Sequence, residues 1–310
     1  MSEVRARVIS QEKGLYRISD GTAVKQASVS GKYRYEALTV SDYPAVGDYV
    51  LAQWPEGDDP AVIRSLFPRK SCFIRRAAGS AKQEQVVAAN IDTVLICMSL
   101  NQNFNLRRLE RYLSVTYDSG AAPVVVLTKA DLCPDVDGMI AQVQGAAPGV
   151  EILAISSLSG DYEAVLPYIV PGKTVAFLGS SGVGKSTLLN AMEPSLQLPV
   201  GEISEKLGRG RHTTRQVQLY PCAGGYLADT PGFSTFEAEQ YVQMKKEQIA
   251  DCFPEFQPYL GECRFSDCSH VCEKGCAILE AMQAGKIAKS RHASYCTLYQ
   301  TAKQRKEWES

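Results

Sequence analysis

The sequence predicts three domains: a small β-barrel over residues 1–68, an α/β domain over residues 69–236 and a helical domain over residues 237–310. Three observations support this division. Short β-rich runs fill the first segment, strands and helices alternate in the second, and helical runs with crowded cysteines form the third. A chain of 310 residues also exceeds the usual size of one hydrophobic core.

The first segment has the pattern of a small barrel. Its β-rich runs at residues 4–9, 15–19, 49–52 and 61–66 are separated by glycine, proline and aspartate residues. Several short strands at this spacing suggest an OB-fold, which often binds oligonucleotides. The fold by itself does not establish that function.

An alternation of strands and helices follows a basic linker at residues 67–80. Because such alternation builds a parallel sheet with helices on both faces, we expect ligands at the carboxyl ends of its strands. The expected strands are residues 93–98, 123–127, 150–155, 174–178 and 226–228, and the expected helices are residues 106–117, 136–143 and 162–166.

The sequence GSSGVGKST follows one of these strands and precedes an apolar helical run. This is the P-loop pattern, in which glycines let backbone N–H groups converge on phosphate oxygens at a helix N-terminus. Lys185 is expected to reach the β- and γ-phosphates, and Ser186 to hold Mg²⁺. The alternative is a chance glycine-rich loop, which the strand–loop–helix context disfavours. The predicted nucleotide-binding residues here are Gly179, Ser180, Ser181, Gly182, Val183, Gly184, Lys185, Ser186 and Thr187.

Two motifs that follow other strands indicate a guanine nucleotide. Thr128, Lys129 and Asp131 resemble the base-reading NKxD motif, with threonine in the asparagine position. Asp131 can accept the ring N–H and the exocyclic amine of guanine, whereas adenine has no such donor pair, so an ATP-driven enzyme is disfavoured. Ser156 and Ser157 resemble the loop whose backbone meets the guanine oxygen, although serines after strands are common.

Two further segments have the pattern of γ-phosphate switches. Asp229 and Gly232 fit DxxG, in which the aspartate reaches Mg²⁺ through water and the glycine N–H meets the γ-phosphate. A β-turn is the alternative for these residues alone. Thr213 and Thr214 are candidates for the hydroxyl that completes the Mg²⁺ shell, and the sequence does not choose between them.

The cysteines near the C-terminus suggest a metal site, because the chain shows no export signal and the cytosol disfavours disulfides. Cys263, Cys268, His270 and Cys276 give three thiolates and one imidazole, a closed tetrahedral set that suits structural Zn²⁺. Cys272 is a rival fourth ligand, and reduced metal-free cysteines are the other alternative.

Charge and hydropathy bound the partners and the location. The net charge is −1, yet three basic runs without acidic residues, at 60–83, 206–228 and 281–306, favour a phosphate-rich partner. No apolar run approaches the roughly 20 residues needed to span a bilayer, and the N-terminus lacks the apolar core of a signal peptide. We therefore expect a cytoplasmic protein without membrane contact. We also expect a monomer.

The order of the motifs is the most informative feature. An ordinary GTPase runs from P-loop to switch threonine, DxxG and base-reading motif, whereas here the base-reading motif comes first, as in a circular permutation. With its barrel, permuted motifs, GRGRHTTR switch and cysteine set, the chain resembles the RsgA/YjeQ family of small ribosomal subunit biogenesis GTPases. The resemblance implies a factor that binds the 30S subunit through its rRNA and hydrolyses GTP to GDP when docked there.

The sequence also bears on the residue that activates water for hydrolysis. Phe233 stands where Ras-like enzymes have the glutamine that orients water, so slow intrinsic hydrolysis is expected. His212 is similar to the proposed catalytic histidine of the family, and contact with rRNA phosphates is an equally good reading of it. A non-catalytic RNA-binding scaffold with a structural nucleotide is the alternative function, which would show no stimulation by small subunits.

Overall fold

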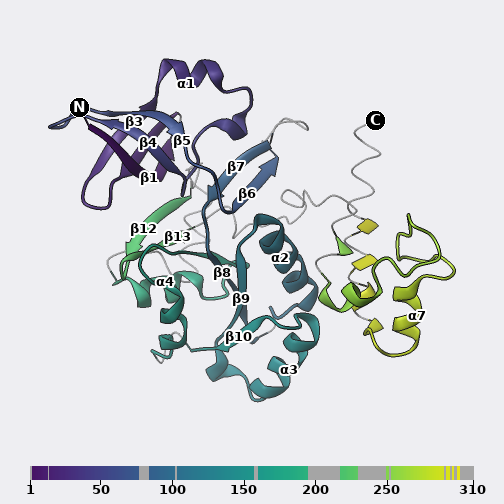
Figure 1. Ribbon diagram of the computed structural model, residues 1–310. Coiled ribbons are helices and arrows are strands. Elements are labelled where there is room, and N and C mark those ends of the chain that lie inside the picture. Colours follow the sequence, from purple (N-terminus) through teal and green to yellow (C-terminus); the bar gives the residue numbers. More distant parts are fainter. Residues whose placement is uncertain are drawn as a thin grey trace, which may run out of the picture.

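The computed structural model describes residues 2–12, 14–76, 84–101, 103–156, 160–194, 217–229, 249–250, 253–289, 291–293, 295–296 and 299–300. Figure 1 shows an N-terminal barrel, a central sheet flanked by helices and a cysteine-rich C-terminal part, the described residues from 253 onward, that lies beside the central helices. Across these ranges, every helix is too short or too polar to cross a membrane.

Five strands close the N-terminal barrel. In the order β1-β2-β3-β5-β4, the last strand pairs back with β1, so the ring has no free edge. Helix α1 (Gly31–Glu36) connects β3 to β4 and is capped by Ser30, whose Oγ accepts from the Tyr33 N–H at 3.1 Å. The predicted OB-fold barrel is confirmed. Its strands are β1 (Ser2–Glu12), β2 (Leu15–Ser19), β3 (Val24–Val29), β4 (Tyr49–Trp54) and β5 (Ala61–Leu66).

The central sheet has the order β10-β9-β8-β11-β13-β12. The strands run parallel except β12, which is antiparallel to β13. Strand β11, which leads into the P-loop, lies between β8 and β13 although β8, β9 and β10 precede it in the chain, and this is the arrangement expected of a permuted GTPase. The strands are β8 (Thr93–Ser99), β9 (Ala122–Thr128), β10 (Glu151–Ala154), β11 (Thr174–Leu178), β12 (Gln218–Cys222) and β13 (Gly225–Asp229).

Helices flank this sheet as the alternating pattern predicts (Figure 1). The segment expected as a short helix at residues 162–166 is instead the 3₁₀ helix η3 (Glu163–Tyr168), which contains Pro167. Proline lacks the N–H that an α-helix interior needs, so the tighter turn is the physical outcome. The helical elements are α2 (Leu106–Ser119), α3 (Val136–Ala146), α4 (Lys185–Met192), η1 (Val40–Asp42) and η2 (Ala130–Leu132).

Part of the predicted basic linker is a hairpin. Strands β6 (Cys72–Arg76) and β7 (Glu84–Ala89) form a separate two-stranded sheet, and Phe73 on β6 is 2% exposed. The linker prediction is wrong here. We weighted the basic residues of this segment and overlooked its apolar residues, such as Phe73, which pack inward as part of a strand. A parallel bridge between Val46 and Ala88 joins this hairpin to the barrel.

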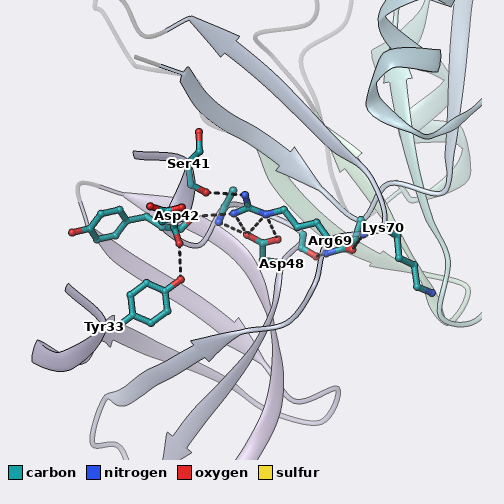
Figure 2. A network of polar contacts seen from close by, with 10 residues as sticks. Tyr33, Ser41, Asp42, Asp48, Arg69 and Lys70 are labelled. Carbon is teal, nitrogen blue, oxygen red and sulfur yellow. Dashed lines mark hydrogen bonds and ion pairs between the residues drawn. The ribbon is translucent and has the colours of Figure 1, made fainter. Parts of the chain in front are cut away.

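An ion pair to a buried carboxylate fixes the barrel to the segment that leaves it (Figure 2). Arg69 donates from Nε and Nη2 to the Asp48 carboxylate at 2.9 and 2.7 Å. Its Nη1 and Nη2 also donate to the carbonyl oxygens of Ser41 and Tyr43, at 2.8 and 2.9 Å. The Asp48 side chain has no exposed surface and accepts a further bond from the Ala45 N–H at 2.7 Å. Arg69, one of the basic residues expected to face a phosphate-rich partner, therefore has a structural role.

Arg7 on β1 forms a second contact between the barrel and the central sheet. It is 3% exposed, and its Nη2 donates to Thr174 Oγ1 on β11 at 2.5 Å and to the Asn90 carbonyl at 3.2 Å. Its guanidinium lies over the rings of Tyr49 and Tyr226, 4.9 and 4.7 Å from their centroids. Burial lowers the pKa of Arg7. The barrel is thus packed onto the sheet through buried side chains.

The C-terminal part is built on aromatic packing. Phe253, Phe256 and Tyr295 have ring centroids 5.0 to 5.5 Å apart, and Tyr295 and Tyr299 are 2% and 8% exposed, as the predicted apolar helical face requires. These residues share one hydrophobic cluster with the helices of the central domain. The named elements are η8 (Pro254–Tyr259) and α7 (Ala277–Gln283), and the predicted apolar residues Leu298 and Ala302 lie outside the described ranges.

Candidate nucleotide site and metal centre

The P-loop connects β11 to α4, in the strand–loop–helix context expected from the sequence. Gly182 and Gly184 have φ of 76° and 96°, which residues with a Cβ rarely adopt. At Gly179 a Cβ would lie 2.5 Å from the Cys97 carbonyl oxygen, so the loop packs closely against β8. Lys185 donates from Nζ to the carbonyls of Gly179 and Ser180 within the loop.

The base-reading motif contacts the P-loop directly. Thr128, 1% exposed at the end of β9, donates its hydroxyl to the Val183 carbonyl at 2.5 Å. Lys129, with φ of 59°, reaches the Gly182 carbonyl from Nζ at 3.0 Å. Threonine in the asparagine position therefore still supports the phosphate loop. Asp131 lies exposed on η2, with its carboxylate accessible.

The parallel strands bring these motifs to one edge of the sheet. Pairing of β8, β9, β10 and β11 in register places the ends of these strands together. Ser156 follows β10 at this edge and is 5% exposed, and Asp229 ends β13, the neighbour of β11. The other predicted residues, Ser157, His212, Thr213, Thr214, Gly232 and Phe233, lie outside the described ranges.

A second site lies in the C-terminal part. The ligand atoms of Cys263, Cys268, His270 and Cys276 all lie within 4.8 Å of one another. The Cys263 and Cys276 sulfurs are 3.9 Å apart, and His270 Nδ1 lies 3.4 and 3.6 Å from them. Tetrahedral zinc with ordinary bond lengths requires about 3.8 Å between sulfurs and about 3.6 Å from sulfur to nitrogen. The rival ligand Cys272 is exposed and outside this group.

The chemistry of the four donors also fits a cation. Burial raises the pKa of Cys268 to about 12 and lowers the pKa of His270. Without a metal the Cys268 thiol is therefore neutral at physiological pH, and a bound dication would supply the charge that a thiolate needs. Because three thiolates and an imidazole leave no open position, the site suits a structural metal.

A carboxylate organises the loop that carries these ligands. Glu273 accepts from the N–H groups of Ser269, Val271 and Cys272, each at 3.1 Å, and from the Ser269 hydroxyl. Burial opposes ionisation of Glu273, but these hydrogen bonds lower its pKa to about 2. His292 Nε2 lies 2.7 Å from the His270 carbonyl oxygen, which orders the ligand backbone from the following helix.

Comparison with known proteins decides the family. A sequence profile described as RsgA GTPase matches residues 66–239, more than half of the chain. This chain belongs to the RsgA GTPase family.

Two relatives of this RsgA GTPase illustrate the similarity. The "small ribosomal subunit biogenesis GTPase RsgA 2" of Lactiplantibacillus plantarum is 39% identical, over 94% of this chain and 82% of the relative. The "small ribosomal subunit biogenesis GTPase RsgA" of Opitutus terrae is 40% identical, over 94% and 81%.

Two solved structures share the fold. YjeQ from Thermotoga maritima superposes with a TM-score of 0.76 at 27% identity, covering 97% of this chain and 99% of that one. YloQ, described as a circularly permuted GTPase, gives 0.73 at 26% identity, covering 98% and 96%. The permuted order inferred from the motifs is confirmed.

One contact of this RsgA GTPase was missed from the sequence. Arg108, in the first turn of α2, donates from Nη1 to the hydroxyl of Ser180 in the P-loop at 3.1 Å. The available signal was the pair Arg107 and Arg108 at a helix N-terminus, where the helix dipole disfavours cations.

Proposed function

We propose that this chain is a GTPase that binds the small ribosomal subunit and hydrolyses GTP to GDP during late maturation of that subunit. One observation supports the proposal: Thr128 and Lys129 are hydrogen-bonded to the P-loop, and Asp131, exposed two residues further on, would then meet the base of a nucleotide held by that loop. Membership of the RsgA GTPase family supports GTP hydrolysis, and the names of its relatives support the ribosomal partner.

We assign phosphate and Mg²⁺ binding to residues of the P-loop and of the two predicted switches. Lys185 would leave the loop carbonyls that it contacts and bind the β- and γ-phosphates, while Ser186 holds Mg²⁺. Asp229 would reach Mg²⁺ through water, and the Gly232 N–H would meet the γ-phosphate. Thr213 or Thr214 would complete the Mg²⁺ shell.

We assign catalysis to a switch residue aided by the small subunit, and rRNA binding to the two domains that flank the GTPase domain. With Phe233 in the glutamine position, His212 is the proposed catalytic residue, and the docked small subunit is proposed to stimulate hydrolysis. The OB-fold barrel and the C-terminal part would bind rRNA on either side of the GTPase domain. We propose a cytoplasmic monomer divided into domains at residues 1–68, 69–236 and 237–310, with one structural zinc held by the four-ligand cluster.

The deciding experiment measures GTP turnover with and without purified small ribosomal subunits at a stated salt concentration, because phosphate contacts are screened by salt. Stimulated turnover is expected. Turnover that stays at the intrinsic rate would favour the scaffold alternative. In the same assay, unchanged subunit-stimulated turnover in His212→Ala would remove that residue from catalysis.

Base specificity is tested separately with Asp131→Asn. The amide can donate to the oxygen of xanthine where the carboxylate accepted from the amine of guanine, so preference should move toward xanthosine nucleotides. Retained GTP preference would remove Asp131 from base recognition.

A further inference from the structure

Helix α2 contacts the P-loop from one side and the C-terminal part from the other. Arg108 Nη1 donates to Ser180 Oγ at 3.1 Å, and Glu110 Oε1 accepts from Arg291 Nη1 at 3.2 Å. Residues two apart on an α-helix point in nearly opposite directions, about 200° around the axis. The two contacts therefore leave α2 on different faces, and the helix lies between the sites that they reach.

The contact between α2 and the C-terminal part is buried, and its arginine has several partners. The Arg291 and Glu110 side chains are 6% and 8% exposed, and Arg291 also donates to Glu255 and to the Ala146 carbonyl at the end of α3. Its guanidinium lies 4.6 Å from the centroid of the Phe253 ring. Because a buried charge that loses its partner is strongly destabilising, the C-terminal part and α2 must move together while this pair is intact.

At the nucleotide end, Ser180 of the P-loop is held by two hydrogen bonds, one to its hydroxyl and one to its carbonyl. Arg108 holds the Ser180 hydroxyl, while Lys185 Nζ lies 2.7 Å from the Ser180 carbonyl oxygen. Lys185 must leave that carbonyl to reach phosphate oxygens, so Arg108 is then the side-chain contact that keeps Ser180 in place. Within the part of the chain that the structure describes, no carboxylate forms an ion pair with Arg108.

We propose that α2 couples two events: packing of the C-terminal part against α2 through the Arg291–Glu110 ion pair, and the conformation of the P-loop. Arg108 is the positioning residue at the nucleotide end of α2. The inference rests on the proposed GTPase function, since it concerns regulation of the same site. Leu109, Tyr112 and Leu113 are at most 5% exposed, so α2 is packed into the core and can transmit a displacement. By thermodynamic linkage, if packing of the C-terminal part against α2 raises the affinity for nucleotide, bound nucleotide must strengthen that packing by the same factor.

A thermodynamic cycle on the full-length protein tests the coupling. Affinity for fluorescent mant-GDP is measured for wild type, Glu110→Gln, Arg108→Ala and the double variant. Glutamine keeps the volume and an oxygen acceptor but removes the α2 charge that Arg291 binds, while the pair between Arg291 and Glu255 stays in place. We expect Glu110→Gln to weaken binding about fivefold or more in the wild-type background, and by less than about twofold when Arg108 is already absent.

Controls separate coupling from loss of fold. Arg107→Ala removes an exposed arginine from the same helical turn and should leave the affinity unchanged, whereas Arg108→Lys should restore part of the coupling. The reciprocal readout is hydrogen exchange of α7 (Ala277–Gln283), which mant-GDP should slow in wild type but not in Arg108→Ala. If Glu110→Gln lowers the melting temperature, Arg291→Lys replaces it in the cycle.

The possible results are distinct. An equal weakening by Glu110→Gln in both backgrounds would overturn the coupling and leave the proposed function standing. Failure of the wild-type protein to bind mant-GDP would overturn the proposed function itself. Coupling that disappears with Arg108, together with the loss of α7 protection, would establish α2 as the connection.

Discussion

The ion pair between Arg69 and Asp48 gives the sharpest stability prediction. Arg69→Ala removes the charged partner of the Asp48 carboxylate, which has no exposed surface in the wild-type protein and would keep one hydrogen bond, from the Ala45 N–H. Breaking a buried pair from one side costs about 3–5 kcal/mol of unfolding free energy. Since whole domains have only about 5–15 kcal/mol, the barrel of this variant should be close to unfolding.

Urea denaturation followed by tryptophan fluorescence measures this loss. Trp54 lies on β4 of the barrel, and replacing the other tryptophan, Trp308→Phe, makes it the only reporter. The midpoint should fall while the slope against urea stays constant, which identifies a change in stability rather than in the denatured state.

Two comparisons decide whether burial is the cause. Lys32→Ala breaks an exposed pair on α1, in which Lys32 and Glu36 are 80% and 61% exposed, and should cost at most about 0.5 kcal/mol. The double variant Asp48→Ala, Arg69→Met removes both charges and should cost less than the sum of the single changes. A loss below about 1 kcal/mol for Arg69→Ala would refute the reasoning, because that is the value of a solvated pair.

Three further predictions concern the two sites. Thr128→Val keeps the side-chain shape but leaves the Val183 carbonyl without its donor, so GDP affinity in a titration should fall about tenfold, and unchanged affinity would contradict the support role. Gly179→Ala places a methyl group 2.5 Å from the Cys97 carbonyl oxygen and should abolish measurable GDP binding, so binding within about threefold of wild type would contradict the close packing. Cys263→Ser, or chelation of the wild-type protein, should release one zinc per chain by elemental analysis and lower the melting temperature; an unchanged zinc content would exclude the cluster.

The strand–loop–helix geometry of the P-loop was predictable from the sequence because it depends on short local patterns. The strand before Gly179 and the helix after it were visible as apolar runs, and the spacing fixed Lys185. The contact from Thr128 to Val183 was not, because it joins residues far apart in the chain through the sheet order. The sequence could place Thr128 after a strand, but it could not show that the Val183 carbonyl lies within hydrogen-bonding distance of the threonine hydroxyl.

The basic residues show what the sequence could not predict. Arg69 and Arg291 belong to runs that suggested phosphate contacts, yet both are engaged with buried carboxylates. Composition reports charge but not the direction in which a side chain points. Their partners Asp48 and Glu110 lie 21 and 181 residues away in the chain, so only the folded chain brings the charges together.

The single residue pair that joins β1 to β12, Ser10 with Gln218, has a consequence for dissecting the protein. It places the barrel against the first residue of β12, the outer strand of the GTPase sheet, where free N–H and C=O groups would otherwise be a template for pairing with another chain. A fragment that began at residue 69 would lose this cover together with Arg7, which packs on Tyr226. Such a fragment should be prone to edge-to-edge aggregation, so the barrel also acts as an intramolecular safeguard for solubility.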